Sequence, residues 1–449
     1  MKIIIVGAGD VGHYLCQVLS EEGHGVTLIE QNEDIADEID DNMDVVVIRG
    51  NGASAKCLQK AGAQSADFLL AMTAHDQLNI VACSLAARLG TKTSIARVHD
   101  EVYADNSVIN YKKHFGIDVL INPEALTAIE LAKHVRNPER MAIEDFARGQ
   151  IELQELKIAP DSKVIAKPLK DLKLPAGIKI AYLERGAQPV VPTANTQLEA
   201  GDNITIIGTP ESILPARRLF SNEDVTPIRV VLYGATETSS AIIRRLSNRR
   251  FKIRVIEPDL EKCRALAEIF PDVTVINGSA TSLRLLEEEQ IGGADYFIAC
   301  TKDDEENVMT CLQTKKLGVK HVELVINKPD YEQVLQNISG FLDIEAIASP
   351  RKVTVVEIKK YLTDKNFMVI GKLRDGGIVF IELKVADGSS GAGKRVCDLR
   401  LPPACMIAAL MKDDGSARVP GAQDIVNAGD RLIMILNRDI ARQAADIFM

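Results

Sequence analysis

The chain has 449 residues, too many for a single hydrophobic core, so its length predicts about three or four domains. A composition of 46% hydrophobic and 26% charged residues is typical of a folded globular protein, and no uncharged apolar run reaches the roughly 18 residues that span a bilayer. The formal net charge of −10 argues against nucleic acid and anionic lipid as direct partners. We expect a cytoplasmic protein without a cleavable leader, because the first residues already form a strand pattern.

Cysteine and histidine spacing argues against a metal centre. The eight cysteines contain no C-x-x-C pair, and the seven histidines show no paired ligand spacing. We therefore expect reduced, mostly buried thiols and no bound metal. The acidic stretch at residues 33–44 is interpreted as a solvated helix face rather than a cation site.

Short runs of Val and Ile alternate with segments of helical length in the first part of the chain. This alternation predicts βαβ units, and therefore a doubly wound parallel sheet of the Rossmann-like α/β class. Val11, Leu15 and Leu19 fall on one face of the first helix, which is the face that packs on the sheet. The expected strands are residues 3–6, 26–29, 45–48, 68–72, 94–98 and 119–121.

A glycine motif joins the first strand to the first helix. In G-x-G-x-x-G, Gly7 permits the tight turn, Gly9 lets the backbone approach a pyrophosphate, and Gly12 allows close packing of helix and strand. The helix N-terminus offers free N–H groups to the anion. A purely structural glycine turn is the alternative. The predicted phosphate-binding residues are Gly7, Ala8, Gly9, Asp10, Val11 and Gly12.

An acid follows the motif at the end of the second strand. Glu30 lies 18 residues past Gly12, close to the spacing at which an acid accepts hydrogen bonds from ribose hydroxyls. Its charge repels a 2′-phosphate, so Glu30 favours NAD(H) over NADP(H). It does not exclude ATP or ADP.

Further candidates lie at the carboxyl ends of later strands, where sheets of this type bind their ligands. Arg97 lies in the last part of the fifth strand, and a surface ion pair is its alternative role. For Asp76 and Asn79, helix capping is the alternative to ligand binding. The candidates after the third and fourth strands are Asn51, Gly52, Thr73 and Ala74.

The pattern changes after Pro123. A helix is expected there, either as a hinge or assembly element or as an ordinary helix packed on its own domain. Residues 151–156 and 203–207 mostly alternate between apolar and polar and are bounded by Pro and Gly, which predicts a small α+β domain with an antiparallel sheet.

The whole arrangement repeats at an offset of 227 or 228 residues. Glu30 matches Glu257, and residues 122–123 match 349–350. The repeat predicts two tandem Rossmann-like domains, each followed by a small α+β domain. The expected boundaries are 1–137, 138–224, 228–364 and 365–449.

The second copy lacks two glycines of the motif. Thr236 replaces Gly9, which puts a Cβ where backbone meets phosphate, and Ser239 replaces Gly12. A weakened or altered second site therefore stays open beside a sheet kept only for assembly. The candidate residues of such a site are Gly234, Glu257 and Gly278.

No nucleophile or acid–base constellation stands out, and only about 80 residues follow each Rossmann-like domain, too few for a large substrate domain. We therefore expect binding without turnover. An NAD-dependent oxidoreductase and a nucleotide-indifferent scaffold are the alternatives.

In combination, four motifs resemble the TrkA family of Trk-system potassium uptake proteins, which carry two tandem RCK (KTN) modules. The resemblance implies a cytoplasmic regulatory subunit, peripheral on the inner face of the cell membrane, that binds NAD(H) and ATP or ADP. It also implies a homotetramer that gates a membrane-embedded potassium-translocating subunit of the TrkH or TrkG type. The motifs are residues 3–12, 50–54, 95–98 and 198–208.

Overall fold

The computed structural model forms two compact units, each visited twice by the chain. One unit comprises Met1–His134 and Pro227–Tyr361, and the other comprises Val135–Thr226 and Leu362–Met449. The structure describes residues 1–103, 108–136, 150–175, 177–185, 188–220, 227–247, 250–362, 367–372, 377–412 and 416–449.

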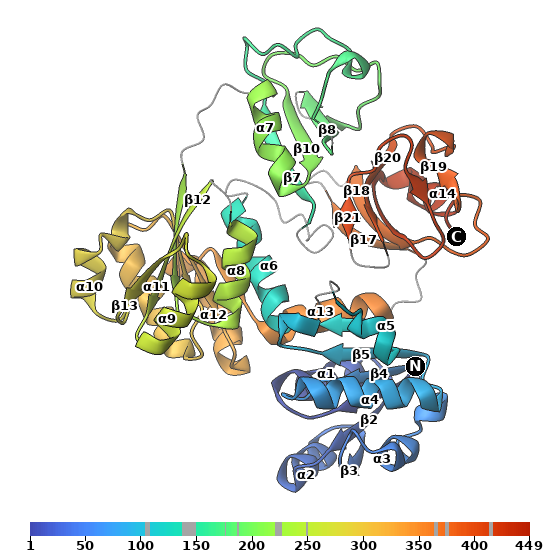
Figure 1. Cartoon of the computed structure of the whole chain (residues 1–449), viewed down its shortest axis with the longest axis vertical. Helices are drawn as coiled ribbons and strands as arrows, with labels where there is room; N and C mark the ends of the chain where they lie inside the picture. The colour runs from blue at the N-terminus through green and yellow to red at the C-terminus, as the bar shows by residue number, and fades with distance from the viewer. Residues whose placement is uncertain are drawn as a thin grey trace. The chain divides into compact units, whose positions relative to one another are not determined.

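The first part of the first unit, lobe 1 (Met1–His134), is a six-stranded parallel sheet in the order β3-β2-β1-β4-β5-β6 (Figure 1). Its strands are β1 Lys2–Val6, β2 Gly25–Glu30, β3 Val46–Arg49, β4 Phe68–Ala71, β5 Thr93–Arg97 and β6 Val119–Ile121. Its helices are α1 Asp10–Glu21, α2 Glu33–Asn42, α3 Ala55–Lys60, α4 Asp76–Leu89, α5 Tyr111–Phe115 and α6 Pro123–Arg136. The central strand β1 is apolar and buried on both faces, as parallel sheets require.

The second part, lobe 2 (Pro227–Tyr361), repeats this order as β13-β12-β11-β14-β15-β16. Its strands are β11 Ile228–Tyr233, β12 Phe251–Glu257, β13 Thr274–Asn277, β14 Tyr296–Ala299, β15 His321–Val325 and β16 Ala346–Ala348. Its helices are α8 Glu237–Leu246, α9 Leu260–Ile269, α10 Leu283–Glu288, α11 Asp304–Lys316, α12 Pro329–Leu342 and α13 Pro350–Leu362. Both lobes confirm the predicted Rossmann-like fold.

The last helix of each lobe contacts the opposite lobe. The hydroxyl of Tyr296 in β14 donates to the carbonyl oxygen of His134 in α6, at 3.1 Å. In return, the Arg351 guanidinium of α13 lies 4.8 Å from the ring centroid of Tyr14 in α1. An ordinary helix packed only on its own domain therefore does not describe α6 or α13.

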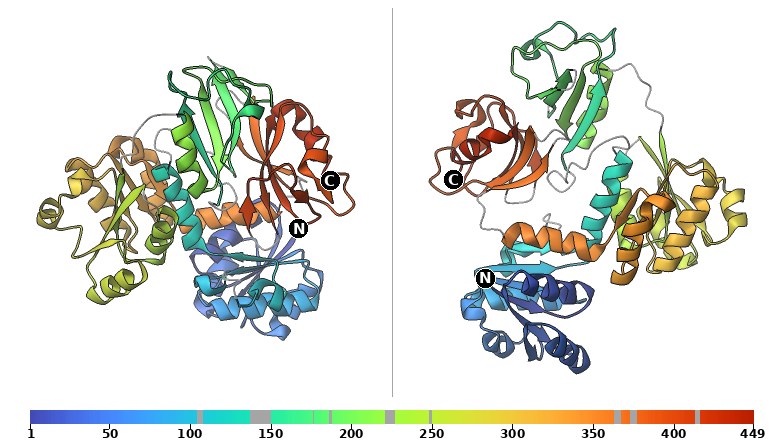
Figure 2. Two further views of the ribbon diagram at one scale, coloured as in Figure 1. Left: turned by 45° about the horizontal axis from the view of Figure 1, so that its top comes forward. Right: turned by 180° about the vertical axis from the view of Figure 1, so that it is seen from behind.

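The second unit holds the two small domains and confirms the predicted antiparallel α+β fold. Their sheets, drawn in Figure 2, have the orders β7-β10-β8-β9 and β17-β18-β23-β20-β21. Residues of both sheets share one hydrophobic cluster. The first domain contains β7 Glu152–Lys157, β8 Lys179–Arg185, β9 Gln188–Val190, β10 Asn203–Gly208 and α7 Pro210–Phe220. The second contains β17 Phe367–Lys372, β18 Ile378–Lys384, β19 Lys394–Arg395, β20 Cys405–Met411, β21 Ala417–Arg418, β22 Ile425–Val426, β23 Arg431–Asn437 and α14 Ala441–Ala445.

The predicted domain boundaries at 137/138, 224 and 364/365 lie outside the described residues and stay predictions. Within the described ranges, no helix combines the length and the apolar character needed to cross a bilayer.

Candidate functional site

Two glycines of the first motif are required by the fold itself. Gly7 has φ +88°, and a Cβ there would lie 2.6 Å from Cγ2 of Thr73. A Cβ on Gly12 would lie 2.0 Å from the carbonyl oxygen of Gly7. Because both contacts are too short for a side chain, a structural role explains these two positions without any ligand.

Gly9 is different, because protein packing does not require a glycine there. Its φ of −65° suits any residue, and a Cβ on Gly9 would meet no heavy atom of the described chain within 4 Å. Gly9 is the N-cap of α1, and in the described part of the chain no side chain caps that helix. The space above Gly9 and the uncapped N–H groups of α1 together fit the approach of an anionic phosphate.

The carboxylate of Glu30 organises the glycine loop. Its Oε2 accepts the backbone N–H of Ala8 at 2.6 Å, while Oε1 accepts those of Gln31 and Asn32 at 2.7 and 2.8 Å. A carboxylate offers about four acceptor positions, so these three bonds leave about one, on Oε2. Glu30 therefore keeps capacity for a single further donor such as a ribose hydroxyl.

Thr73 follows strand β4, and Arg97 ends the neighbouring strand β5. Hydrogen bonds from Asn79 connect these two residues. The Nδ2 of Asn79 donates to the carbonyl oxygens of Thr73 and Arg97, both at 2.9 Å, and its Oδ1 accepts the N–H of Thr73. The carboxylate of Asp76 accepts the backbone N–H of His99, which lies 3.0 and 3.1 Å from its two oxygens, and the N–H of Asp100 at 3.0 Å. Asp76 and Asn79 thus connect loops, and neither caps α4, whose N-cap is His75.

Arg97 is mostly buried, so it is not the surface ion pair considered from the sequence. Its side chain is 15% exposed, and its guanidinium lies 3.6 Å from Oε1 of Glu124 in the first turn of α6. Burial raises the pKa of Glu124, but the hydrogen bond from His99 and the charge of Arg97 outweigh it and hold that pKa below its usual value. The Nε of Arg97 is buried without a hydrogen-bond partner among the described residues.

The remaining candidates of lobe 1 also lie at the carboxyl edge of the sheet. Gly52 is required by packing, because a Cβ there would lie 2.0 Å from Cγ1 of Val6. Asn51 is exposed, and its Oδ1 accepts the N–H of Ala53 at 2.8 Å. Ala74 is exposed beside Thr73. The structure therefore places all lobe 1 candidates at this one edge, and their contact with a nucleotide stays a prediction.

The three candidates of lobe 2 occupy the equivalent edge. Gly234 has φ +96°, and Oε2 of Glu257 accepts the N–H of Ala235 at 2.6 Å. Gly278 is partly buried after β13. Unlike α1, helix α8 has a side-chain cap, because Oγ1 of Thr236 accepts the N–H of Ser239 at 3.2 Å.

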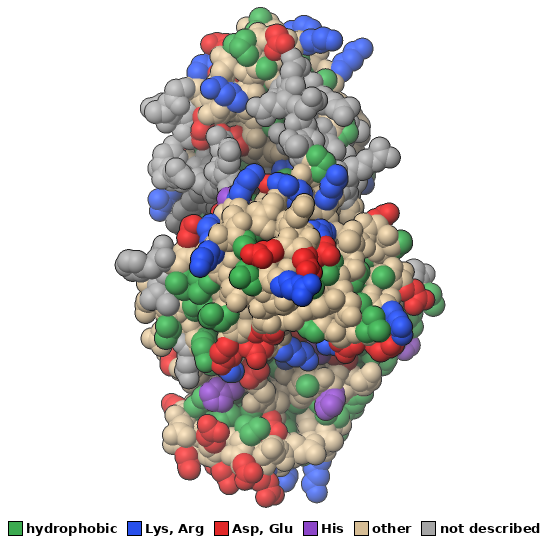
Figure 3. Space-filling view, turned by 90° about the vertical axis from the view of Figure 1, so that its left-hand side faces the viewer, with side chains coloured by type: hydrophobic (Ala, Val, Ile, Leu, Met, Phe, Trp, Pro, Cys, Tyr) green, Lys and Arg blue, Asp and Glu red, His purple; other side chains and the backbone are tan. Residues whose placement is uncertain are grey.

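The acidic stretch is an exposed face of α2. All acidic residues of α2 are exposed, whereas Ala36 and Ile39 are buried. Red side chains gather at the lower end of Figure 3, where lobe 1 lies. The described residues contain no group of three His, Cys, Asp or Glu side chains arranged to hold a metal ion.

Sequence reasoning missed Glu124 and His99 beside Arg97. Glu124 directly follows Pro123, where the repeat places the start of a helix against the end of the sheet. Sequence reasoning also missed Tyr233, which is the counterpart of Val6 in lobe 2. The hydroxyl of Tyr233 forms hydrogen bonds with Ser279 and Glu306. The replacement of Val by Tyr between the two copies was the available signal.

Comparison with known proteins gives a family for both halves of the chain. The TrkA-N domain family matches residues 3–123 and 230–350, and the TrkA-C domain family matches residues 153–221 and 380–449. The order N, C, N, C agrees with the predicted duplication.

Full-length relatives and solved structures agree with this match. The chain is 30% identical to "Trk system potassium uptake protein TrkA homolog 1" of Methanosarcina mazei over 100% of both chains. It is 31% identical to "Trk system potassium uptake protein TrkA" of Haemophilus influenzae, over 97% of this chain and 96% of that protein. The RCK domain of GsuK shares the fold, with a TM-score of 0.56 at 18% identity over 99% of this chain and 94% of that one.

A structure of the GsuK channel bound to NAD has a TM-score of 0.57 at 18% identity, over 99% of this chain and 78% of that one. These matches confirm the resemblance found in the sequence. Both copies of the repeat and the full length of the relatives lead to one conclusion: the chain belongs to the TrkA family of Trk system potassium uptake proteins.

Proposed function

We propose that this chain is a regulatory subunit that binds NAD(H), and also ATP or ADP, in lobe 1 and thereby gates a membrane potassium uptake system. The observation that carries the proposal is Gly9, a glycine that neither backbone strain nor packing requires, at the uncapped N-terminus of α1. A residue that the fold does not need is explained by a ligand that approaches the backbone there.

Each part of a nucleotide has a matching group on this edge. The N–H groups of α1 and the open space at Gly9 suit the pyrophosphate, and the remaining acceptor position of Glu30 suits a ribose hydroxyl. The guanidinium of Arg97, whose side chain is 15% exposed, adds a positive charge at this edge that would attract a phosphate. GsuK, which shares the RCK fold, is known in forms bound to NAD and to ADP, in keeping with this ligand class.

The bound nucleotide acts as an effector, with no hydride transfer assigned to it. A ligand shifts a conformational equilibrium only if it binds one arrangement better than another. Helix α1 meets this need, since its N-terminus faces the ligand site. Its Tyr14 contacts Arg351 of α13, and its C-cap residue Glu22 contacts Lys359 of the same helix. Movement of α1 on binding would therefore be felt in lobe 2.

The family supplies the rest of the proposal. Relatives are named as potassium uptake proteins, so we assign the output to a membrane-embedded potassium-translocating subunit of the TrkH or TrkG type. A homotetramer of this chain, peripheral on the inner face of the cell membrane, would transmit the change to that pore. An NAD-dependent oxidoreductase is the competing function, and steady consumption of NADH by the purified chain with a metabolite would favour it.

Gly9→Asp tests the proposal. Aspartate also caps helices well, so the variant should fold, while its charge repels the phosphate. We expect NADH binding, measured by calorimetry, to weaken by at least about 100-fold, which is about 2.7 kcal/mol. Nucleotide-dependent potassium uptake in cells should be lost with it.

Gly23→Asp is the matched control. It adds the same charge just beyond the other end of α1, at an exposed glycine whose Cβ would meet no described heavy atom within 4 Å. Aspartate tolerates its φ of +79° better than most residues do. Binding and uptake that survive Gly9→Asp would exclude the glycine loop as the nucleotide sensor.

A further inference from the structure

Each glycine loop leads into a helix, and the two helices differ in how the free N–H groups at their N-termini are capped. Helix α1 has no side-chain cap among the described residues, whereas Thr236 caps α8 through its Oγ1, which accepts the N–H of Ser239 at 3.2 Å. A side-chain oxygen in that place takes the position in which a phosphate oxygen would accept a hydrogen bond. The anion site of lobe 2 is therefore occupied by lobe 2 itself.

The third motif position shows that the two loops also differ in shape. In lobe 1, a Cβ on Gly12 would lie only 2.0 Å from the carbonyl oxygen of Gly7. In lobe 2 the equivalent Ser239 is accommodated, fully buried, and its hydroxyl donates to the carbonyl oxygen of Gly234 at 2.6 Å. The lobe 2 loop is thus wider at this point and is held by a hydrogen bond that lobe 1 cannot make.

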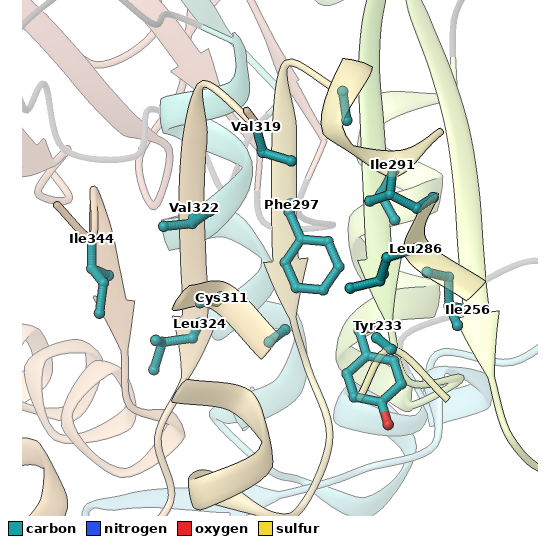
Figure 4. Packing of buried hydrophobic residues seen from close by; sticks show 14 of the residues in the cluster. Tyr233, Ile256, Leu286, Ile291, Phe297, Cys311, Val319, Val322, Leu324 and Ile344 are labelled. Carbon is teal, nitrogen blue, oxygen red and sulfur yellow. The ribbon is translucent and has the colours of Figure 1, made fainter. Parts of the chain in front are cut away.

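A third difference is a set of hydrogen bonds in lobe 2 that connects the loop after β13 with the start of α11. The hydroxyl of Tyr233 lies 3.1 Å from Oγ of Ser279 and donates to Oε1 of Glu306 at 2.5 Å. Figure 4 shows the Tyr233 ring beside Leu286, with its hydroxyl oxygen pointing away from the labelled hydrophobic residues. The lobe 1 counterparts of these three residues are Val6, Gly52 and Leu78, whose side chains form no hydrogen bonds.

This hydrogen-bonded chain spans the place where lobe 1 keeps its nucleotide candidates. Ser279 corresponds to Gly52, and Glu306 lies in the first turn of α11, which follows Thr301 as α4 follows Thr73. Burial, followed by the hydrogen bond to Glu306, raises the pKa of Tyr233, so its hydroxyl stays a donor at physiological pH. Lobe 2 therefore joins two elements that lobe 1 leaves unjoined by these side chains.

The acid that persists in lobe 2 does not argue for a ligand. Glu257 accepts the N–H of Ala235 at 2.6 Å, and Glu30 accepts that of Ala8 at the same distance. Glu257 also accepts the N–H of Asp259 at 2.9 Å and is 6% exposed. Unlike the half-buried Glu30, Glu257 is almost closed to solvent, so its hydrogen bonds to the loop account for its presence.

We infer that each chain binds one dinucleotide, in lobe 1, and that lobe 2 closes its own equivalent site with Thr236, Ser239 and Tyr233. This inference rests on the proposed function of lobe 1. It assigns lobe 2 the role of a nucleotide-free counterpart, which takes part in regulation through its contacts with α1 and α6.

Binding stoichiometry tests the inference on the full chain. Equilibrium dialysis with NADH should give one nucleotide per chain for the wild type and no measurable binding for Gly9→Asp. Thr236→Asp adds the same charge at the equivalent position of lobe 2 and keeps a capping side chain, so its binding should equal that of the wild type. Two nucleotides per wild-type chain, with one surviving in Gly9→Asp, would overturn the inference and leave the lobe 1 site intact. A wild type that binds no nucleotide would instead overturn the proposed function.

Hydrogen exchange gives a second measurement, which locates the bound nucleotide along the chain. Saturating NADH should slow exchange in residues 7–12 and leave residues 234–239 unchanged. Slowed exchange at 234–239 in Gly9→Asp, where lobe 1 no longer binds, would show a ligand in lobe 2 and contradict the inference.

Discussion

Lobes 1 and 2 share one strand order and one hydrogen bond between the acid and the glycine loop, yet differ at three positions in and beside that loop. In lobe 1 these positions are Gly9, Gly12 and Val6. In lobe 2 they carry hydroxyl groups that bond to their own lobe. The comparison shows that both copies keep the buried strands of the fold, while a few polar side chains distinguish their glycine loops.

The largest expected effect concerns the third glycine of the motif. Gly12→Ala should destabilise lobe 1 by roughly 3 kcal/mol, because its Cβ would lie 2.0 Å from a backbone oxygen that has little room to move. Ser239→Ala should cost about 1 kcal/mol, the value of one hydrogen bond. Hydrogen exchange of α1 and α8 peptides under increasing urea measures both local stabilities. Equal costs would mean that the two loops do not differ in shape.

A second contrast lies in the fifth strands, where lobe 2 carries a buried carboxyl. Glu323 in β15 is 0% exposed, and neither of its carboxylate oxygens has a hydrogen-bond partner among the described residues. His134 Nδ1 of α6 is 3.9 Å away. Burial, then the charges of Glu345 and Glu130, raise the pKa of Glu323 well above its usual value, although Lys133 lowers it. The register places Ile95 at this position in lobe 1.

This raised pKa predicts a pH dependence with a definite sign. Below the ordinary Glu pKa of 4.5, Glu323 holds its proton in both the folded and the unfolded chain, so its ionisation does not lower the free energy of unfolding. Above it the unfolded chain releases the proton first, and lobe 2 loses up to about 1.4 kcal/mol per pH unit until the folded pKa is passed. Glu323→Gln should remove this loss, as the urea midpoint of lobe 2 measured from pH 4 to pH 9 would show. A wild type and a variant with parallel pH profiles would contradict the prediction.

The order of strands and helices was easier to predict from the sequence than the contacts between buried polar side chains. Strands such as β1 and β4 were predictable because apolar runs bounded by turns have few other structures open to them. Glu323 shows the limit, since a charged residue in a strand indicates an exposed position, whereas β15 buries it completely. Its environment depends on α6, about 190 residues earlier in the chain, and no local pattern reports such a contact.

For the candidate site, too, local motifs were predictable from the sequence, whereas hydrogen bonds between distant residues were not. The glycine motif and Glu30 were found because phosphate binding needs fixed spacing within one βαβ unit. Asn79 and Asp76 were assigned to capping or ligand binding, but they tie neighbouring strand ends together. The bond from Tyr233 to Glu306 joins residues 73 positions apart, so only three-dimensional structure reveals it.

The next prediction concerns the closing hydrogen bonds of lobe 2. Tyr233→Phe should destabilise lobe 2 by about 1.5 kcal/mol, because Ser279 and Glu306 lose a partly buried partner. Tyr331→Phe is the matched control, since its hydroxyl bonds Glu305 on an exposed surface and should contribute less than about 0.5 kcal/mol. Urea unfolding of lobe 2, followed by peptide-resolved hydrogen exchange, compares the two. A cost for Tyr233→Phe no greater than that of the control would mean that the bridge does not hold the lobe 2 edge together.

The smallest stability effect, and the one that separates folding from binding most cleanly, comes from giving lobe 1 the cap of lobe 2. Gly9→Thr should change the stability of lobe 1 by less than about 0.5 kcal/mol, because the position has open space and threonine and glycine are similar N-caps. Its hydroxyl would then satisfy the N–H groups that a phosphate needs, so NADH affinity should fall by at least about tenfold, or about 1.4 kcal/mol. Thr236→Gly, the reverse change, should cost only a few tenths of a kcal/mol and leave NADH affinity unchanged. An unaltered affinity in Gly9→Thr would mean that the helix cap is not what distinguishes the two lobes, and the distinction would rest on Ser239 and Tyr233 alone.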